Sequence, residues 1–301
     1  MAQLRLKDVL RSCIHVANDY KVLGGLQQYP WTDTEGQTPL APEVMARFRK
    51  NLSFGHWNAS GGLYGTPAQV SEAKRLLKNA LVGQPGSLKF LSPRTLQLAK
   101  RFAKPFKVFT GWDLRRTVEL IEPVFGLMRG VPTVHALASA YWRKRSPVPE
   151  DPNPDRDGCG LLWYAPVAPA TGAHVTKLVQ ITTSILLSFG FEPMISLSMV
   201  TPRTVSCVIS ITYDRDAAGQ DAQAMGCYDE LVSRCNGEGY YPYRLGIQSM
   251  ARTAQPDAYS NLIKTLKETL DPNGILAPGR YDEQAAADSL ADRRATPTFR
   301  H

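Results

Sequence analysis

The amino-acid sequence predicts an α+β fold, in which an antiparallel sheet carries helices on one of its faces. Residues 195–199 and 205–213 alternate between apolar and small polar side chains, which is the period of a half-buried strand. Apolar residues at helical spacing precede them at 178–189, and a further helix is expected at 221–235. Two strands that follow each other directly between helices are expected to pair as antiparallel neighbours.

The clearest helix start in the first half of the chain opens a helix at 67–81. Thr66 can act as the N-cap, Pro67 suits the first helical position, and Gln69 completes a capping box. The apolar residues that then repeat at helical spacing are Val70, Ala73, Leu77 and Leu81. Just before this helix, residues 57–64 are expected to form a strand with a glycine-rich middle.

A second unit begins with the apolar stretch LLWYAPVAP (161–169), which is expected to form one strand. The helix after it has its apolar residues at Leu178, Ile181, Ile185 and Phe189. The two alternating strands, joined by a turn at Thr201-Pro202, and the last helix complete the order strand-helix-strand-strand-helix.

The first half holds a looser copy of this order. Its expected elements are a strand at 57–64, a helix at 67–81, a strand at 87–91, and helices at 94–103 and 113–128. Between the copies lies SPVPEDPNPDRDG (146–158), whose four prolines and many charges predict a surface linker. We therefore predict a duplicated antiparallel sheet of ferredoxin-like repeats over residues 1–240. A segment at 241–281 follows, and a polar, alanine-rich tail at 282–301 is expected to be disordered.

Composition limits the class of protein. The net charge is +8, but the basic residues are scattered and follow no aromatic-basic pattern, so no nucleic-acid partner is expected. No run reaches the roughly 18 apolar residues of a membrane span, so no membrane partner is expected. The five cysteines form no CxxC pair, which favours reduced thiols in a cytoplasmic protein.

Most motifs that mark a catalytic site are missing from the sequence. It has no GxSxG nucleophile motif, no HExxH metal motif, no Walker loop and no GxGxxG fingerprint. Asp214, Asp216 and Asp221 lack the glutamate of a calcium loop. His174, in the first turn of a helix, is more typical of a surface residue than of a ligand. No metal site and no catalytic residue is assigned.

One segment, GYYPYRLGIQSM (239–250), places a phenol beside a permanent cation. Tyr243 and Arg244 could together hold an anionic oxygen and lower the pKa of a bound phenol by stabilising its ionised form. A second interpretation stays open, in which Tyr243 is structural and Arg244 lies on the surface.

Five segments carry a family resemblance. They are SFGHWNASGGLYGTP (53–67), GLLWYAPVAPATG (160–172), YDRDAAGQDAQAMGCYDEL (213–231), GYYPYRLGIQSM and LKETLDPNGILAPGRY (266–281). Taken together and in this order, over about residues 1–281, they resemble the vanillyl-alcohol oxidase and p-cresol methylhydroxylase family of FAD-linked oxidases. Within the last segment, Asp271-Pro272-Asn273-Gly274 predicts a helix stop and a turn.

The resemblance implies that residues 1–240 form a substrate-binding cap domain. Residues 241–281 are implied to return to the flavin domain, where LDPNGILAPGRY closes the flavin site. The residues implied to contact ligands are Tyr243 and Arg244 at the phenolate oxygen of the substrate, and Arg280, Pro278 and Gly279 at the cofactor. The implied reaction is hydride transfer from the benzylic carbon of a para-substituted phenol to FAD, and the resulting quinone methide takes up water or rearranges.

Members of the family often link FAD covalently through a His or Tyr at the position of Gly160-Leu161. Neither residue offers that chemistry, so we expect FAD, if bound, to be non-covalent. The FAD-binding domain of the family precedes the part that this sequence resembles. A separate FAD-binding polypeptide, or self-association through 241–281, is therefore expected. The alternative is a non-catalytic small-molecule-binding or interaction protein derived from a truncated oxidase.

Overall fold

The computed structural model describes residues 1–52, 54–84, 86–99, 101, 122–250 and 258–277. The chain divides into two compact units, Met1–Tyr241 and Pro242–His301, and each is described by itself. The predictions that fall outside the described residues concern Pro278, Gly279, Arg280, the start of the helix at 113–128 and the tail at 282–301.

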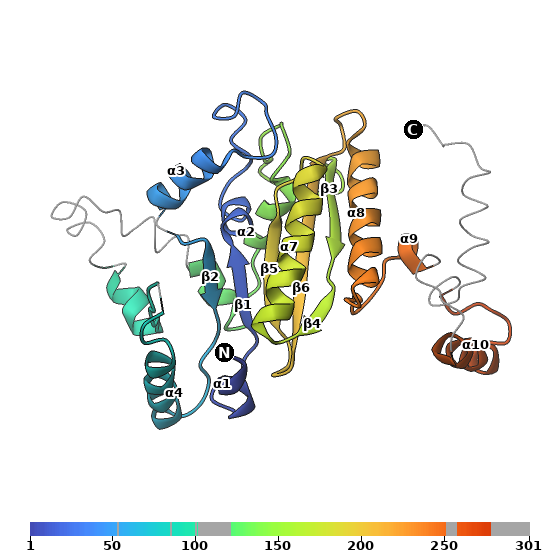
Figure 1. Ribbon diagram of the computed structural model, residues 1–301. Helices are drawn as coiled ribbons and strands as arrows, with labels where there is room; N and C mark the ends of the chain where they lie inside the picture. Colours follow the sequence, from blue (N-terminus) through green and yellow to red (C-terminus); the bar gives the residue numbers. More distant parts are fainter. Residues whose placement is uncertain (53, 85, 100, 102–121, 251–257, 278–301) are drawn as a thin grey trace. The chain divides into compact units, whose positions relative to one another are not determined.

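Six strands of the first unit form one antiparallel sheet (Figure 1). Their bounds are β1 Ile14–Asn18, β2 Trp57–Ser60, β3 Cys159–Tyr164, β4 Val167–Pro169, β5 Met194–Met199 and β6 Thr204–Asp214. The order across the sheet is β2-β1-β5-β6-β3, and β4 also pairs with β6. The described pairings are all antiparallel, which confirms the predicted α+β class.

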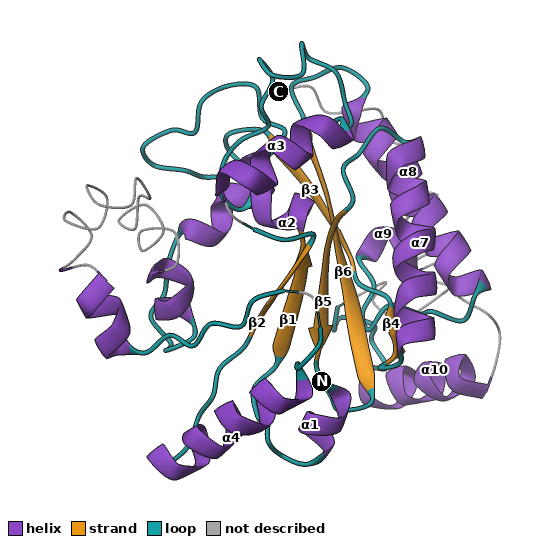
Figure 2. Ribbon diagram, turned by 60° about the vertical axis from the view of Figure 1, so that its left-hand side comes forward, coloured by secondary structure: helices purple, strands orange, loops and turns teal. Residues whose placement is uncertain are grey.

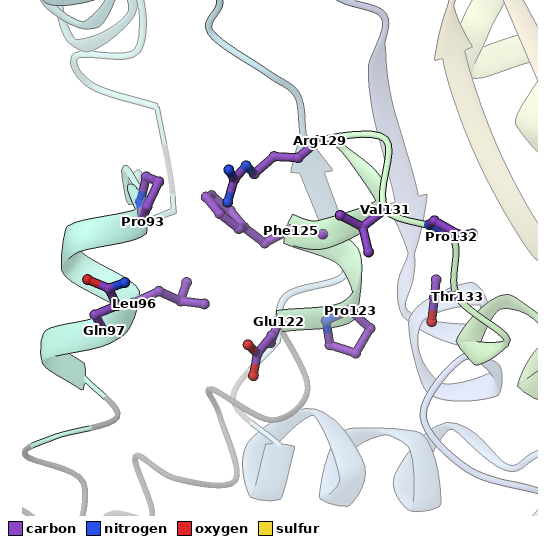
Figure 3. A pocket seen from close by; sticks show the side chains of 11 residues that line it. Pro93, Leu96, Gln97, Glu122, Pro123, Phe125, Arg129, Val131, Pro132 and Thr133 are labelled. Atoms are coloured by element: carbon purple, nitrogen blue, oxygen red, sulfur yellow. The ribbon is translucent and has the colours of Figure 1, made fainter.

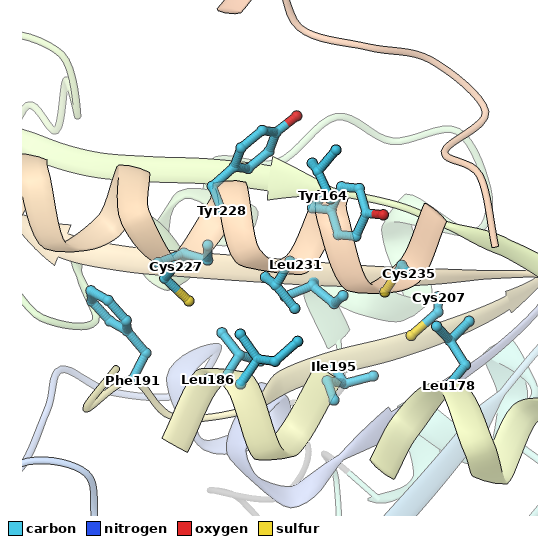
Figure 4. Close-up of a cluster of buried hydrophobic side chains, with 14 of the residues drawn as sticks. Tyr164, Leu178, Leu186, Phe191, Ile195, Cys207, Cys227, Tyr228, Leu231 and Cys235 are labelled. Atoms are coloured by element: carbon cyan, nitrogen blue, oxygen red, sulfur yellow. The ribbon is translucent and has the colours of Figure 1, made fainter. Parts of the chain in front are cut away.

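Two long helices cover one face of this sheet. α7 (Gly172–Ser188) and α8 (Gln220–Gly237) lie side by side along the strands in both views (Figures 1 and 2). The buried β6 residues beneath them are Cys207, Ile209, Ile211 and Tyr213. Figure 4 shows Leu178 and Leu186 of α7 meeting Leu231 and Cys235 of α8 in this core. Each large side chain buried here contributes roughly 1.5–3 kcal/mol. We call this the helix-covered face.

Shorter elements pack on the opposite face. Met194 precedes Ile195 on β5, so the two side chains point to opposite faces, and Met194 packs with Leu23 and Trp142. Leu23 belongs to α2 (Asp19–Gly24), and Trp142 directly follows the 3-10 helix η1 (His135–Tyr141). A Cβ at Gly24 would overlap the terminal methyl of Met194, so a larger residue there would require the Met194 side chain to move.

A buried carboxylate, Glu192, joins these elements. It accepts hydrogen bonds from Arg143 Nε (2.8 Å), from Trp142 Nε1 (3.0 Å) and from the backbone N–H of Leu40 (3.0 Å). The side chains of Arg143 and Glu192 are 4% and 1% exposed. A buried charge is stable only when it is paired and hydrogen-bonded, so these three partners are required for Glu192 to be buried.

The first half of the chain contributes β1 and β2 to the same sheet. The strand predicted at 87–91 is wrong, because these residues form no strand; Phe90 instead packs beneath Lys74, whose Nζ lies 5.5 Å from the ring centroid. The remaining helices of this half are α1 Ala2–Leu6, α3 Pro42–Leu52 and α4 Pro67–Ala80, with helical turns at 93–99 and 122–127. The capping box predicted for α4 is formed by Thr66 and Gln69. Residues 146–158 lead from the end of η1 into β3 within the first unit.

The single strand predicted at 161–169 is interrupted at Ala165, directly before Pro166. Proline has no N–H to donate to a ladder, and the stretch divides into β3 and β4, both paired with β6. The Pro166 carbonyl still accepts a hydrogen bond from the N–H of Cys207 at 2.8 Å. The break therefore bends the strand and keeps it on the sheet.

In the second unit, a buried aspartate fixes the turn after the last helix. The helices of this unit are α9 Ile247–Met250 and α10 Ala258–Leu270. Asp271 receives hydrogen bonds from Lys267 Nζ (2.6 Å) and from the backbone N–H groups of Ile275 (2.9 Å) and Leu276 (2.8 Å). These donors hold the pKa of Asp271 below its ordinary value, the Lys267 hydrogen bond being the largest cause. The helix stop and turn predicted at 271–274 are confirmed.

We expect Glu192→Ala to lower the free energy of unfolding by about 3–5 kcal/mol, because Arg143 and Trp142 would keep buried donors without an acceptor. Urea denaturation of the chain measures this loss. The control is Glu72→Ala, which removes an exposed partner of Arg75 and is expected to change stability little. Equal effects of the two substitutions would show that the buried carboxylate is not essential.

Candidate functional site

The face of the sheet opposite α7 and α8 carries a row of hydroxyl side chains. They are Ser196 and Ser198 of β5 and Ser206, Ser210 and Thr212 of β6, and we call this surface the polar face. Ser198 lies directly opposite Ser206 in the pairing of the two strands. Side chains that are directly opposite in an antiparallel pair share a face and lie close together. The alternation that predicts the strands therefore also lines this face with hydroxyls, and those of Ser198, Ser206, Ser210 and Thr212 belong to buried residues.

Strand β1 adds a histidine to this row. His15 pairs with Ser198, and its Nδ1 lies 2.9 Å from Ser198 Oγ. His15 is exposed, whereas Ser198 is buried. The Oγ of Ser206 is buried and has no hydrogen-bond partner among the described residues. Buried hydroxyls are normally bonded, so Ser206 offers a donor and acceptor that the described chain does not use.

Strand β3 borders the polar face with two exposed apolar side chains. Leu161 lies opposite Thr212, and Trp163 lies opposite Ser210. Their exposed fractions are 43% and 49%. An apolar pair of this kind beside a row of hydroxyls is suited to the ring of an aromatic ligand.

Helix α2 places a lysine over the same face. Asn18 caps α2 by accepting from the N–H of Lys21 at 3.0 Å, and its side chain also bonds the backbone of Pro193 and Ile195. This arrangement directs Lys21 Nζ onto Ser210 Oγ at 3.0 Å. Burial lowers the pKa of Lys21 from its ordinary value of 10.5. The ammonium is therefore held in a poorly solvated position next to Ser210 and, across the strand pair, Trp163.

Lys21 is half-buried and differs from several buried or half-buried cations of the first unit, which pair with carboxylates. Among the described residues, Arg143 pairs with Glu192, Lys144 with Asp214, and Arg49 with Asp19. No described carboxylate lies within ion-pair distance of Lys21, and its one described side-chain partner is the neutral hydroxyl of Ser210. An ammonium held in this way has an unused capacity to bind an anion.

The sequence-predicted pair Tyr243 and Arg244 lies in the second unit. Both side chains are exposed, and the Arg244 guanidinium carbon lies 5.7 Å from the centroid of the Tyr243 ring. The two residues therefore meet, and they are open to solvent on the unit that contains them. Whether they bind a phenolate stays a prediction. The cofactor-binding role predicted for Pro278, Gly279 and Arg280 concerns residues outside the described part of the chain.

An open hollow of about 600 Å³ lies between the helical turns at 93–99 and 122–127 (Figure 3). Phe125 and Arg129 form one wall, with the guanidinium carbon 6.0 Å from the ring centroid. Leu96 and Gln97 stand opposite. The segment 102–121, which connects the two walls in sequence, lies outside the described residues, so no site is assigned to this hollow.

The cysteines do not add a reactive centre. All five are free, and Cys159, Cys207, Cys227 and Cys235 are buried. Burial raises the pKa of the Cys235 thiol to about 11 and that of Cys227 to about 12, so neither is a thiolate near neutral pH. Within the described residues, no group of three His, Cys, Asp or Glu side chains is arranged to hold a metal ion. None of the described helices has both the length and the apolar character to cross a bilayer.

Two curated proteins are similar to the chain over most of its length. One is the 1'-carboxy-chondrochloren decarboxylase of Chondromyces crocatus, 38% identical over 281 residues, which are 93% of this chain and 52% of the relative. The other is the 4-cresol dehydrogenase (hydroxylating) flavoprotein subunit of Pseudomonas putida, 26% identical over 92% of this chain and 47% of the relative. The chain thus spans about half the length of these relatives. No family model matches it.

Solved structures show the same fold. Substrate-bound p-cresol methylhydroxylase superposes with a TM-score of 0.73 at 24% identity, over 93% of this chain and 48% of that one. The isoeugenol complex of 4-ethylphenol oxidase from Gulosibacter chungangensis superposes with a TM-score of 0.75 at 23% identity, over 93% and 49%. The family resemblance expected from the sequence is confirmed by these similarities. Sequence patterns gave no signal for Lys21 or His15, because only the folded sheet brings them to the polar face.

We expect Lys21→Met to raise the free energy of unfolding near neutral pH, because it removes a poorly solvated ammonium. In the unfolded chain the Lys21 ammonium keeps its proton up to its ordinary pKa of about 10.5, whereas in the folded chain it loses the proton at a lower pH. The wild type therefore gains stability as pH rises through the interval between these two pKa values. The advantage of the methionine variant should shrink over that interval, and urea denaturation at several pH values from about 7 to about 10 measures it.

The control is Lys177→Met, which removes an exposed ammonium paired with Glu238. The pKa of Lys177 is raised, chiefly by its hydrogen bond to Glu238. The difference in free energy of unfolding between Lys177→Met and the wild type should therefore not shrink over the same pH range. A constant difference for Lys21→Met would show that Lys21 is well solvated.

Proposed function

We propose that this chain, whose homologues include flavoproteins of the p-cresol methylhydroxylase type, forms the substrate-covering part of a flavin-dependent oxidoreductase acting on para-substituted phenols. The observation that carries the proposal is the polar face. His15 and Lys21, held by the buried hydroxyls of Ser198 and Ser210, can bind the polar groups of a ligand, while Trp163 can pack against its ring. FAD, when bound, would supply the acceptor for a hydride from the benzylic carbon of the phenol.

The described residues fit the ring end of FAD better than its diphosphate end. Leu161, exposed at the edge of the polar face, presents the apolar surface that a flat ring system requires. A diphosphate needs many backbone or cationic donors converging on it, and the described residues form no such nest. We propose that the diphosphate is held outside the described residues, and that FAD is bound non-covalently because Leu161 offers no nucleophile.

Tyr243 and Arg244 are proposed to bind the phenolate oxygen. Both are exposed, so they can reach a ligand, and Arg244 is a permanent cation next to a phenol hydroxyl. A charge-assisted bond to the phenolate would favour its ionised form, and an ionised phenol releases a benzylic hydride more readily.

A partner surface is proposed in residues 241–281. The exposed apolar side chains there include Tyr241, Tyr243, Ile275 and Leu276. Tyr240 and Met250 are buried and do not contribute to this surface; Tyr240 packs in the core of the first unit, and its Oη lies 3.0 Å from His174 Nδ1. Exposed apolar groups of this number favour an interface with an FAD-binding polypeptide or with a second copy of the chain. The free thiols support a cytoplasmic location.

The name of the Chondromyces relative specifies a carboxylated substrate. We therefore include para-substituted phenols that carry a carboxyl group among the proposed substrates. The test of the function is a visible spectrum of the tagged chain purified in its natural assembly. We expect flavin absorbance that is bleached when 4-ethylphenol is added without oxygen. An assembly without flavin, or a flavin that para-alkylphenols do not reduce, would favour a non-catalytic binding protein.

The proposed non-covalent attachment predicts that acid denaturation of the assembly releases the flavin into the supernatant. Because neither Gly160 nor Leu161 can form a bond to the isoalloxazine ring, no colour should stay with the precipitated protein. Absorbance of the two fractions measures the result. Yellow colour in the washed pellet would contradict this prediction.

For Arg244→Ala we expect binding of 4-ethylphenol to weaken about tenfold or more, since a charge-assisted hydrogen bond contributes roughly 1.5–3 kcal/mol. Titration calorimetry on the assembly measures the dissociation constant. Lys264→Ala, which removes an exposed cation from α10 of the same unit, is the matched control and should bind normally. If Arg244→Ala weakens the binding of toluene, which has no phenol oxygen, by the same factor, then Arg244 has only a structural role.

A further inference from the structure

Lys21 is positioned more precisely than the attachment of its helix requires. The start of α2 is already held on β5 by Asn18, which accepts from the N–H groups of Lys21 (3.0 Å) and Ile195 (3.2 Å) and donates to the Pro193 carbonyl (2.5 Å). The long side chain of Lys21 then continues across the polar face and ends at Ser210. The ammonium is therefore not needed to attach α2 to the sheet.

The surroundings of the ammonium are neutral on the described part of the chain. Ser210 lies between Met194 of β5 and Trp163 of β3 in the pairing of the three strands. The carboxylates nearest in the fold have cations of their own: Glu192 is bound by Arg143, and Asp19 by Arg49. A lysine in these surroundings is the group that a single negative charge on a ligand would meet.

We propose that Lys21, held in position by the buried Ser210, forms a subsite for a carboxylate group of the substrate, with the substrate's apolar part lying against Trp163. This inference rests on the proposed function and deepens it, because it names the residues that select a carboxylated phenol. The ammonium has three N–H donors, of which Ser210 accepts one, so two remain for the two oxygens of a carboxylate. A phosphate, with more oxygens and a charge nearer −2, would require further cationic donors, and no other cation is described next to Ser210.

The subsite also accounts for the lowered pKa of Lys21. Burial disfavours the ammonium when its partner is a neutral hydroxyl. A bound carboxylate replaces the missing solvation and restores the charged form. Selectivity follows, because an uncharged ligand of the same shape would leave the ammonium without compensation.

The test compares 4-hydroxyphenylacetate with 4-hydroxyphenylacetamide, which has the same shape and no charge, by titration calorimetry on the assembly. We expect the wild type to bind the acid at least about tenfold more tightly than the amide. Lys21→Met should abolish this preference and leave the affinity for the amide within about twofold. Lys21→Arg should retain part of the preference, and Lys177→Met all of it.

Three outcomes would overturn the subsite. They are no preference for the acid in the wild type, no binding of the acid, or an equal loss of affinity for the acid and the amide in Lys21→Met. The urea denaturation described above verifies that the methionine variant is folded. The outcome for the proposed function is separate. A Lys21-dependent preference for the acid in an assembly without flavin would support the subsite and contradict the oxidoreductase function. Flavin reduction by 4-ethylphenol without any preference for the acid would support the oxidoreductase function and contradict the subsite.

Discussion

The buried carboxylate of Glu192 fixes the arrangement on which the polar face depends. Its three donors come from two segments that are far apart in sequence: Leu40 lies in one, and the neighbours Trp142 and Arg143 lie in the other. A carboxylate out of water is tolerated only while all of these donors are in place, so the segments that carry them cannot separate independently. Met194, two residues after Glu192, is the first residue of β5. The same interaction therefore sets where β5 begins and which of its residues face α2.

Because side chains alternate between the two faces of a strand, fixing the face of Met194 also fixes the face of the other β5 residues and of their partners in β6. Once Met194 faces α2, Ile195 must face the helix-covered core, and the pairing of β5 with β6 transmits the same choice to Ser210 and Ile209. A slip of one residue would place the serines under α7 and α8 and the apolar residues on the opposite face. The large free energy of core burial therefore also holds the small polar side chains in place, and the polar face is a rigid consequence of the core.

Local patterns were enough to predict the elements that bury the core. Strands β5 and β6, the helices on either side of them and the capping box of α4 all appear in the sequence as periodic or capping signals. Strand β1 has no such signal: it is only five residues long, and its partner β5 lies about 180 residues away in the pairing of His15 with Ser198. The strand predicted at 87–91 failed for the converse reason, because an apolar stretch without a partner in the sheet does not form a strand.

The same distinction explains the site. Tyr243 and Arg244 are neighbours in the chain, so the sequence alone could predict that they meet. Lys21 is placed by a cap whose side chain bonds Pro193, 175 residues further along, and no local pattern contains that information.

Stability and ligand binding make opposite demands on the polar face. A neutral face with all its polar groups hydrogen-bonded would give the folded chain the highest stability. This face instead contains an ammonium without a described carboxylate and a buried Ser206 hydroxyl without a described partner. Each lowers the stability of the folded chain, because desolvated polar groups are favourable only when they are paired. The neighbouring ion pairs, Lys144 with Asp214 and Arg143 with Glu192, show that this fold does pair its buried charges elsewhere. Local departures of this kind are typical of functional sites, where a ligand completes what the protein leaves open. Because both groups point to the same face as Trp163, that ligand would have to be polar at one side and aromatic at the other.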